Sequence, residues 1–223
     1  MTLVMDPGLS KSKTKTRRFR ERSTASELVK RALDLSLTSI GLVVISPLLV
    51  STVAAIKLTS PGPVFFRQER IGKDGKPFRM LKFRSMYVDA EARRASLLST
   101  SDREGVCFKR KDDPRITRAG RFLRRFSIDE LPQLINVLKG DMSLVGPRPA
   151  LPEEVARYSP YARKRLQAMP GLTGLWQVAG RADIGFERMV EMDIAYARSK
   201  TLALDLMLLA LTFRAVFSGR GAY

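Results

Sequence analysis

The longest apolar run of this sequence lies near its amino terminus. No charged residue occurs from Leu35 to Ile56, and a helix of that length is sufficient to cross the roughly 30 Å hydrocarbon layer of a bilayer. Pro47 stands near the middle, where proline removes a backbone hydrogen bond and kinks a helix, and Ser46 can satisfy the freed carbonyl. The pattern predicts a membrane helix over residues 26–58 that is kinked at Ser46 and Pro47.

Basic residues flank this run on both sides. Residues 1–25 are polar and basic, and we expect them to form a disordered arm. Residues 57–128 hold 19 basic and 8 acidic residues. Because basic flanks favour the cytoplasmic side, the two flanks together predict a re-entrant helix that enters and leaves by one leaflet. A Pro-kinked spanning helix is the alternative. A second alternative is a secretory signal peptide cleaved after Val53-Ala54-Ala55, although the apolar and basic parts are long for such a peptide.

Residues 59–223 are predicted to form a cytosolic or interfacial catalytic domain. Two strand patterns flank a polar loop at 72–76 and predict a β-hairpin. Other segments show helical composition or turn residues. The predicted elements are strands at 63–71 and 77–86, helical segments at 87–98, 118–126, 129–139, 153–168, 186–199 and 202–217, a surface loop at 99–113, an extended connection at 147–152, and a short strand at 175–178. The fold class is therefore α+β: a small mixed helical domain with a β-hairpin, the re-entrant helix and amphipathic helices at the membrane interface.

The amino-acid composition limits which side chains could act as catalytic groups. The 223 residues can bury one sizeable core. The chain has no histidine and one cysteine, Cys107, so an internal disulfide is excluded and the commonest general base and zinc ligand are missing. Carboxylates are left as the candidate catalytic groups. A formal charge of +18 calls for a polyanionic partner, and on charge alone nucleic acid and anionic membrane lipids both qualify.

The acidic doublet Asp129-Glu130 is the main candidate for chemistry. It precedes the segment Pro147-Arg148-Pro149, in which two prolines stiffen the backbone around a guanidinium suited to phosphate. Cationic neighbours would favour the ionised form of both carboxyls. The structural alternative is a capping box, in which Ser127 and Glu130 begin a helix over 129–139 that Gly140 closes.

Several ordered blocks extend this pattern over most of the chain. They are Ile45-Ser46-Pro47, KFRSM at 82–86, SIDELPQ at 127–133, NVLKGDMSLVGPRP at 136–149, PGLTGLWQV at 170–178 and GRGAY at 219–223. From about Ser26 to Tyr223 the chain resembles the bacterial sugar transferases, the monotopic enzymes that load a sugar phosphate onto a polyprenyl phosphate. It resembles their short form, without additional amino-terminal spanning helices. One departure lies before the last helix, where a single tyrosine, Tyr196, stands in place of the paired tyrosines common in the family.

The resemblance assigns roles to residues. It implies that Asp129 is the nucleophile and that Glu130 positions Mg²⁺ or tunes Asp129, so that both are candidate metal ligands. Arg148, held by Pro147 and Pro149, and Arg124 would bind substrate phosphate. Lys82 and Arg84 alternate with Phe83 on a strand and either face phosphate or form a solvated face. Arg181 and Asp193 fall in matching blocks without an assignable role.

The resemblance also implies a reaction. A UDP-hexose would react with undecaprenyl phosphate in two steps at the cytoplasmic face of the bacterial inner membrane, with release of UMP. The GRGAY ending is similar to that of exopolysaccharide hexose-1-phosphate transferases, which favours galactose or glucose. Anionic lipids are expected partners, an oligomer is compatible with the sequence, and no nucleic acid is expected. The rival hypothesis is a basic, membrane-tethered protein that binds nucleic acid or anionic lipid without catalysis.

Overall fold

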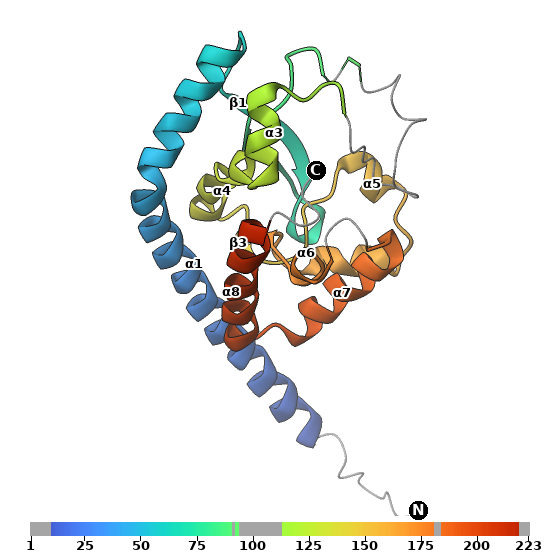
Figure 1. Cartoon of the computed structure of the whole chain (residues 1–223). Coiled ribbons are helices and arrows are strands. Elements are labelled where there is room, and N and C mark those ends of the chain that lie inside the picture. The colour runs from blue at the N-terminus through green and yellow to red at the C-terminus, as the bar shows by residue number, and fades with distance from the viewer. Residues whose placement is uncertain (1–9, 91, 94–112, 181–183, 219–223) are drawn as a thin grey trace, which may run out of the picture.

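The computed structural model describes residues 10–90, 92–93, 113–180 and 184–218, and it describes side chains from residue 25 to residue 216 within those ranges. It shows a mostly helical α+β fold with two small sheets (Figure 1). Its elements are α1 (Ser10–Thr59), β1 (Phe65–Ile71), β2 (Pro77–Phe83), α3 (Arg118–Arg125), α4 (Gln133–Lys139), β3 (Ser143–Val145), α5 (Pro152–Ala156), β4 (Gly171–Thr173), α6 (Leu175–Ala179), α7 (Phe186–Ser199) and α8 (Leu202–Ser218). Three short 3₁₀ turns cover Lys73–Gly75, Ile128–Glu130 and Ala162–Gln167.

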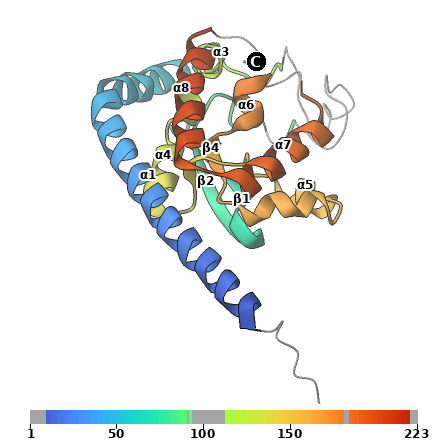
Figure 2. The same cartoon turned by 90° about the horizontal axis from the view of Figure 1, so that it is seen from below.

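Helix α1 is the one helix of the described residues long and apolar enough to cross a membrane, over Ala25–Thr59. It contains Pro47 and changes direction in its second half (Figure 2). The carbonyl of Val43, which Pro47 cannot bond, accepts the hydroxyl of Ser46 at 2.8 Å, so the predicted compensation at the proline is confirmed. The helix begins at Ser10 and therefore includes much of the segment predicted as a disordered arm.

Two parts of α1 are joined to the same globular body. Near the middle of the helix, where the uncharged run starts, buried Asp34 accepts hydrogen bonds from Ser143 Oγ at 2.7 Å and from the Leu144 amide at 3.1 Å. Lys30 Nζ contacts Asp205 of α8 at 2.7 Å and the Val145 carbonyl at 3.2 Å. Between these anchors and the carboxyl end, large apolar side chains are exposed, namely Ile40, Val43, Val44, Leu48 and Val50.

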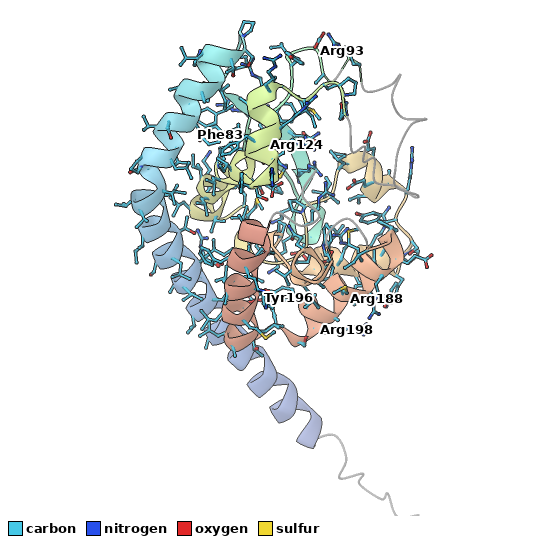
Figure 3. All side chains as sticks on the ribbon, in the orientation of Figure 1. Phe83, Arg93, Arg124, Arg188, Tyr196 and Arg198 are labelled. Carbon is cyan, nitrogen blue, oxygen red and sulfur yellow. The ribbon has the colours of Figure 1, made fainter. Side chains whose placement is uncertain are left out.

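The carboxyl end of α1 packs on the β-hairpin. Strands β1 and β2 pair antiparallel, as predicted, with Phe65 opposite Phe83. Phe83 is buried among Ile56 of α1, Leu123 of α3 and Ile128, and it lies between α1 and α3 in Figure 3. Burying a phenylalanine of this kind contributes roughly 2–3 kcal/mol. The hairpin therefore joins α1 to the segment that carries the acidic doublet.

The second sheet fixes the position of the Pro147–Pro149 segment, which follows its strand β3. Strands β3 and β4 run parallel, with Ser143 opposite Gly171 and Val145 opposite Thr173. A Cβ at Gly171 would lie 2.0 Å from the Gly146 nitrogen, so this approach of two backbones requires glycine. The prediction of a strand at 175–178 is wrong, because the strand lies at Gly171–Thr173 and residues 175–178 begin α6. Trp176 of α6 packs on Met189 of α7.

The remaining helices match the pattern in part. The predictions for 118–126, 186–199 and 202–217 are confirmed by α3, α7 and α8. The helix predicted over 153–168 is wrong as one element, because α5 ends at Ala156 and a 3₁₀ turn follows at Ala162. The described residues of 87–98 form turns rather than a helix. Cys107, Arg181, most of the 99–113 loop and the GRGAY ending lie outside the described residues.

Candidate active site around the acidic doublet

The doublet lies in a tight turn rather than at a helix start. Ser127 adopts a left-handed conformation with φ 56° and makes no side-chain capping bond. The capping box that was the structural alternative is therefore absent, and the helix that was expected from Asp129 begins at Gln133 as α4. Gly140, with φ 91°, closes α4 as predicted. A non-glycine residue at positive φ costs roughly 1 kcal/mol or more and is frequent at functional sites.

The two adjacent carboxyls have different surroundings. Asp129 is 7% exposed. Glu130 is half-buried and forms an ion pair with Lys82 of β2, with 2.6 Å between Lys82 Nζ and Glu130 Oε1. Lys82 thus faces the doublet while its neighbour Phe83 points into the core. The strand alternation predicted for these two residues is confirmed.

The surroundings move the two pKa values in opposite directions. Burial raises the pKa of Asp129 to about 6, and the charge of Glu130 adds to this, against the lowering effect of Lys82 and Arg124. Burial also acts to raise the pKa of Glu130, but Lys82, Arg148 and Arg124 together hold it below its ordinary value. The expectation that cations would favour ionisation of both carboxyls is correct for Glu130 and wrong for Asp129, where burial is the larger effect.

Arg148 is presented on a backbone held at four consecutive carbonyls. Each carbonyl from Pro147 to Ala150 accepts one hydrogen bond: Pro147 from the Gly171 amide at 2.9 Å, Arg148 from Arg165 Nη2 at 3.2 Å, Pro149 from Arg70 Nη1 at 3.0 Å, and Ala150 from the Ile71 amide at 2.9 Å. The hairpin, β4 and the Ala162–Gln167 turn thus fix this segment together. Its stiffness comes from these contacts as well as from the two prolines.

Three cations surround the doublet. Lys82 contacts Glu130 directly. Arg148 lowers the pKa of Glu130, and Arg124 of α3, labelled in Figure 3, lowers the pKa of both carboxyls, so both guanidinium groups lie within electrostatic reach. This arrangement of two carboxyls and three cations can bind a polyanionic substrate and present a carboxylate oxygen to it.

Arg84 has a structural role away from the doublet. Its guanidinium is buried and donates to Ser60 Oγ and to the Ser60 carbonyl, both at 2.8 Å, and to the carbonyl of Pro61. These bonds hold the turn that follows α1. The structure therefore gives no support to a phosphate contact by Arg84.

Other buried charges close to the site escaped the sequence analysis. Arg165 and Arg70 donate to the carbonyls of Arg148 and Pro149, and buried Glu154 lies 3.8 Å from the Arg148 guanidinium. No sequence signal distinguishes these residues from the many exposed charges of a basic chain. Asp193, which stood in a matching block without a role, is buried against Arg165.

The doublet is compatible with a magnesium ion. Within the described part of the chain, no three acidic or cysteine side chains gather into a closed metal site. Mg²⁺ is usually held by one or two carboxylates, with waters and substrate phosphates completing its shell. Asp129 and Glu130 fit that donor set.

Comparison with known proteins agrees with the geometry. Residues 25–219 match the protein family described as "Bacterial sugar transferase". The chain is 44% identical over 196 residues to the galactosyl transferase CpsE of Streptococcus agalactiae, a match that covers 87% of this chain and 43% of that protein. It is 37% identical over 200 residues to the exopolysaccharide production protein ExoY of Rhizobium meliloti, with 88% of each chain covered.

A third relative carries a descriptive name. The UDP-glucose:undecaprenyl-phosphate glucose-1-phosphate transferase of Escherichia coli is 41% identical over 212 residues, which are 90% of this chain and 43% of that enzyme. This chain therefore spans less than half the length of several relatives that it matches, and most of the length of ExoY. With the match over residues 25–219, the chain belongs to the bacterial sugar transferase family.

Proposed function

We propose that this protein transfers a hexose 1-phosphate from a UDP-sugar to undecaprenyl phosphate and releases UMP. The observation that carries the proposal is the doublet itself: a buried Asp129 with a raised pKa beside an ionised Glu130, within reach of Lys82, Arg124 and Arg148. The names of relatives describe the same chemistry in those proteins, with galactose or glucose as the sugar.

The reaction proceeds in two displacements. The ionised carboxylate of Asp129 attacks the β-phosphorus of the donor, the bond from that phosphorus to the bridging oxygen breaks, and UMP leaves with the bridging oxygen. The product is an aspartyl phosphate that carries the sugar. An oxygen of undecaprenyl phosphate then attacks the same phosphorus, the bond to the Asp129 oxygen breaks, and the carboxylate is restored.

The charged neighbours have separate roles. Arg148 and Arg124 bind the oxygens of the diphosphate and offset the charge that repels the carboxylate. Lys82 keeps Glu130 ionised, and Glu130 with Asp129 would hold Mg²⁺ against the substrate phosphates. The ion would neutralise phosphate charge and favour departure of UMP.

We also infer that α1 is a re-entrant membrane helix at the cytoplasmic face. The uncharged run from Leu35 to Ile56 is anchored on both sides, because Lys30 and Asp34 before it and Ile56 at its end contact the same globular body, with exposed apolar side chains between them. A crossing helix would separate the two ends of this run by the thickness of the bilayer. In a Cys107→Ser background, cysteines introduced at Ser10 and Gly75 are expected to be labelled from the same side; labelling from opposite sides would show that the helix crosses.

The transfer itself is tested with purified protein in detergent, UDP-galactose or UDP-glucose, Mg²⁺ and undecaprenyl phosphate. UMP release is expected for the wild type and for Asp74→Asn, a control on the exposed hairpin loop, and not for Asp129→Asn. Without undecaprenyl phosphate, the wild type is expected to release about one UMP per protein and to retain the sugar phosphate covalently. Full turnover by Asp129→Asn would exclude Asp129 as the nucleophile.

A further inference from the structure

A second pair of opposite charges is buried outside the doublet. Arg165 of the Ala162–Gln167 turn is 2% exposed and Asp193 of α7 is 1% exposed, and their side chains are in direct contact. Desolvating two charges costs several kcal/mol per ion, and their mutual attraction offsets this only when the geometry and the remaining hydrogen bonds are good. The proposed reaction uses neither residue, so the pair requires another explanation.

The hydrogen bonds of Arg165 lead to Arg148. Its Nη1 donates to Tyr158 Oη at 2.8 Å, and its Nη2 donates both to Asp193 and to the Arg148 carbonyl, the latter at 3.2 Å. Tyr158 is itself buried, with its ring 5.6 Å from that of Phe186 on α7. The guanidinium is therefore fixed by three partners, one of which is the backbone of the phosphate-binding residue.

The side chain of Arg148 is held by the same group of buried charges. Glu154, 3% exposed, lies 3.8 Å from Arg148 Nη1, and its other carboxylate oxygen accepts the Leu151 amide at 2.8 Å. Burial raises the pKa of Asp193 to about 6, while the charges of Arg165 and Arg148 act against the rise. Arg148 is thus electrostatically coupled to both Asp193 and Glu154.

We propose that Arg165 and Asp193 are positioning residues that fix Arg148 for binding the donor diphosphate. The proposal rests on the proposed function, because it takes Arg148 as a phosphate ligand. Asp193 orients the Arg165 guanidinium, Arg165 holds the Arg148 carbonyl, and Glu154 restrains the Arg148 side chain. A bidentate phosphate contact depends on such orientation, so loss of Asp193 weakens phosphate binding without removing any group that touches the ligand.

The test is a double-mutant cycle on the affinity for UDP, measured by titration calorimetry on the full chain in detergent. Asp193→Asn is expected to weaken UDP binding about tenfold in the wild-type background and less than about threefold when Arg148 is already alanine. Arg188→Gln is the matched control on α7, because it breaks an exposed ion pair with Glu191 at 2.8 Å. It is expected to leave UDP binding unchanged. Arg188 is labelled in Figure 3.

A second variant covers the case in which Asp193→Asn does not fold. Arg165→Lys keeps the charge opposite Asp193, but one ammonium cannot reproduce the planar fork that reaches Tyr158, Asp193 and the Arg148 carbonyl. Arg165→Lys is also expected to weaken UDP binding more in the wild-type background than when Arg148 is alanine. A cooperative thermal transition would show that the variant is folded. Equal losses of UDP affinity in both backgrounds, or no UDP binding by the wild type, would overturn the proposal. Coupled UDP binding without UMP release would instead refute the proposed function alone.

Discussion

Replacing Asp129 with asparagine is expected to stabilise the fold at neutral pH while it abolishes transfer. The amide has nearly the shape of the protonated carboxyl and carries no charge, so it removes the cost of keeping a carboxylate in a buried site. The pKa of Asp129 is about 6 in the folded protein, against an ordinary value of 3.8. This gap corresponds to about 3 kcal/mol.

The sign follows from proton binding. Between about pH 4 and pH 6 the folded state keeps a proton on Asp129 that the unfolded state has lost, so the free energy of unfolding falls as pH rises through this window. Above pH 6 both states are ionised and the full cost remains. Asp129→Asn should therefore gain about 3 kcal/mol at pH 7 and almost nothing at pH 4. For a chain of this size the gain corresponds to a Tm increase of about 6–12 °C.

Thermal unfolding in detergent at pH 4 and pH 7 measures the effect. Glu130→Gln provides a contrast, because cations lower the pKa of Glu130 and its charge is favourable in the fold, so this variant should lose stability at pH 7. Asp74→Asn, on the exposed hairpin loop, should change little at either pH. If Asp129→Asn were no more stable than the wild type at pH 7, burial would not be the dominant influence on this carboxyl.

Three further predictions concern the site and its support. The rate of UMP release should fall about tenfold per pH unit below pH 6, because only ionised Asp129 can attack; a flat profile from pH 5 to 8 would contradict the raised pKa. Lys82→Met should reduce transfer at pH 7 while it changes the free energy of unfolding by less than about 1 kcal/mol; unchanged turnover would show that the ion pair with Glu130 is dispensable. Gly171→Ala should cost about 3 kcal/mol or more in urea unfolding, since its Cβ would meet the Gly146 backbone, whereas Gly185→Ala enters open space and should not; similar losses in both would mean that the β3–β4 approach tolerates a side chain.

The local sequence pattern correctly predicted the elements that do not depend on contacts with distant parts of the chain. The hairpin follows from two strand patterns around a polar loop, and α7 and α8 follow from continuous helical composition. The segments that failed depend on tertiary contacts. Residues 175–178 have strand-like composition, yet Trp176 packs on Met189 as part of a helix. The strand instead begins at Gly171, whose lack of a side chain permits the close approach of the Gly146 backbone. Ser127 fitted a capping motif that its backbone conformation excludes.

For the candidate site, the sequence predicted which residues come together better than it predicted their pKa values. The doublet, Lys82 and the residues of the Pro147–Pro149 segment could be identified from the sequence. The opposite pKa directions could not, because they depend on how deeply each carboxyl is buried, which the sequence does not state. Arg165 was invisible for the same reason: it lies in a basic helical stretch where an exposed charge is the ordinary expectation, and its burial comes from packing against α7.

The docking of α1 has a practical consequence for anyone who wishes to work with a soluble fragment. Removing the first 58 residues would leave Asp205 without Lys30, deprive Ser143 and the Leu144 amide of the Asp34 carboxylate, and strip Ile56 from around Phe83. Each lost contact supports either the strand β3, which precedes Pro147, or the hairpin that carries Lys82. Such a truncated chain should aggregate rather than yield a water-soluble catalyst, so purification and inhibitor screening have to retain α1.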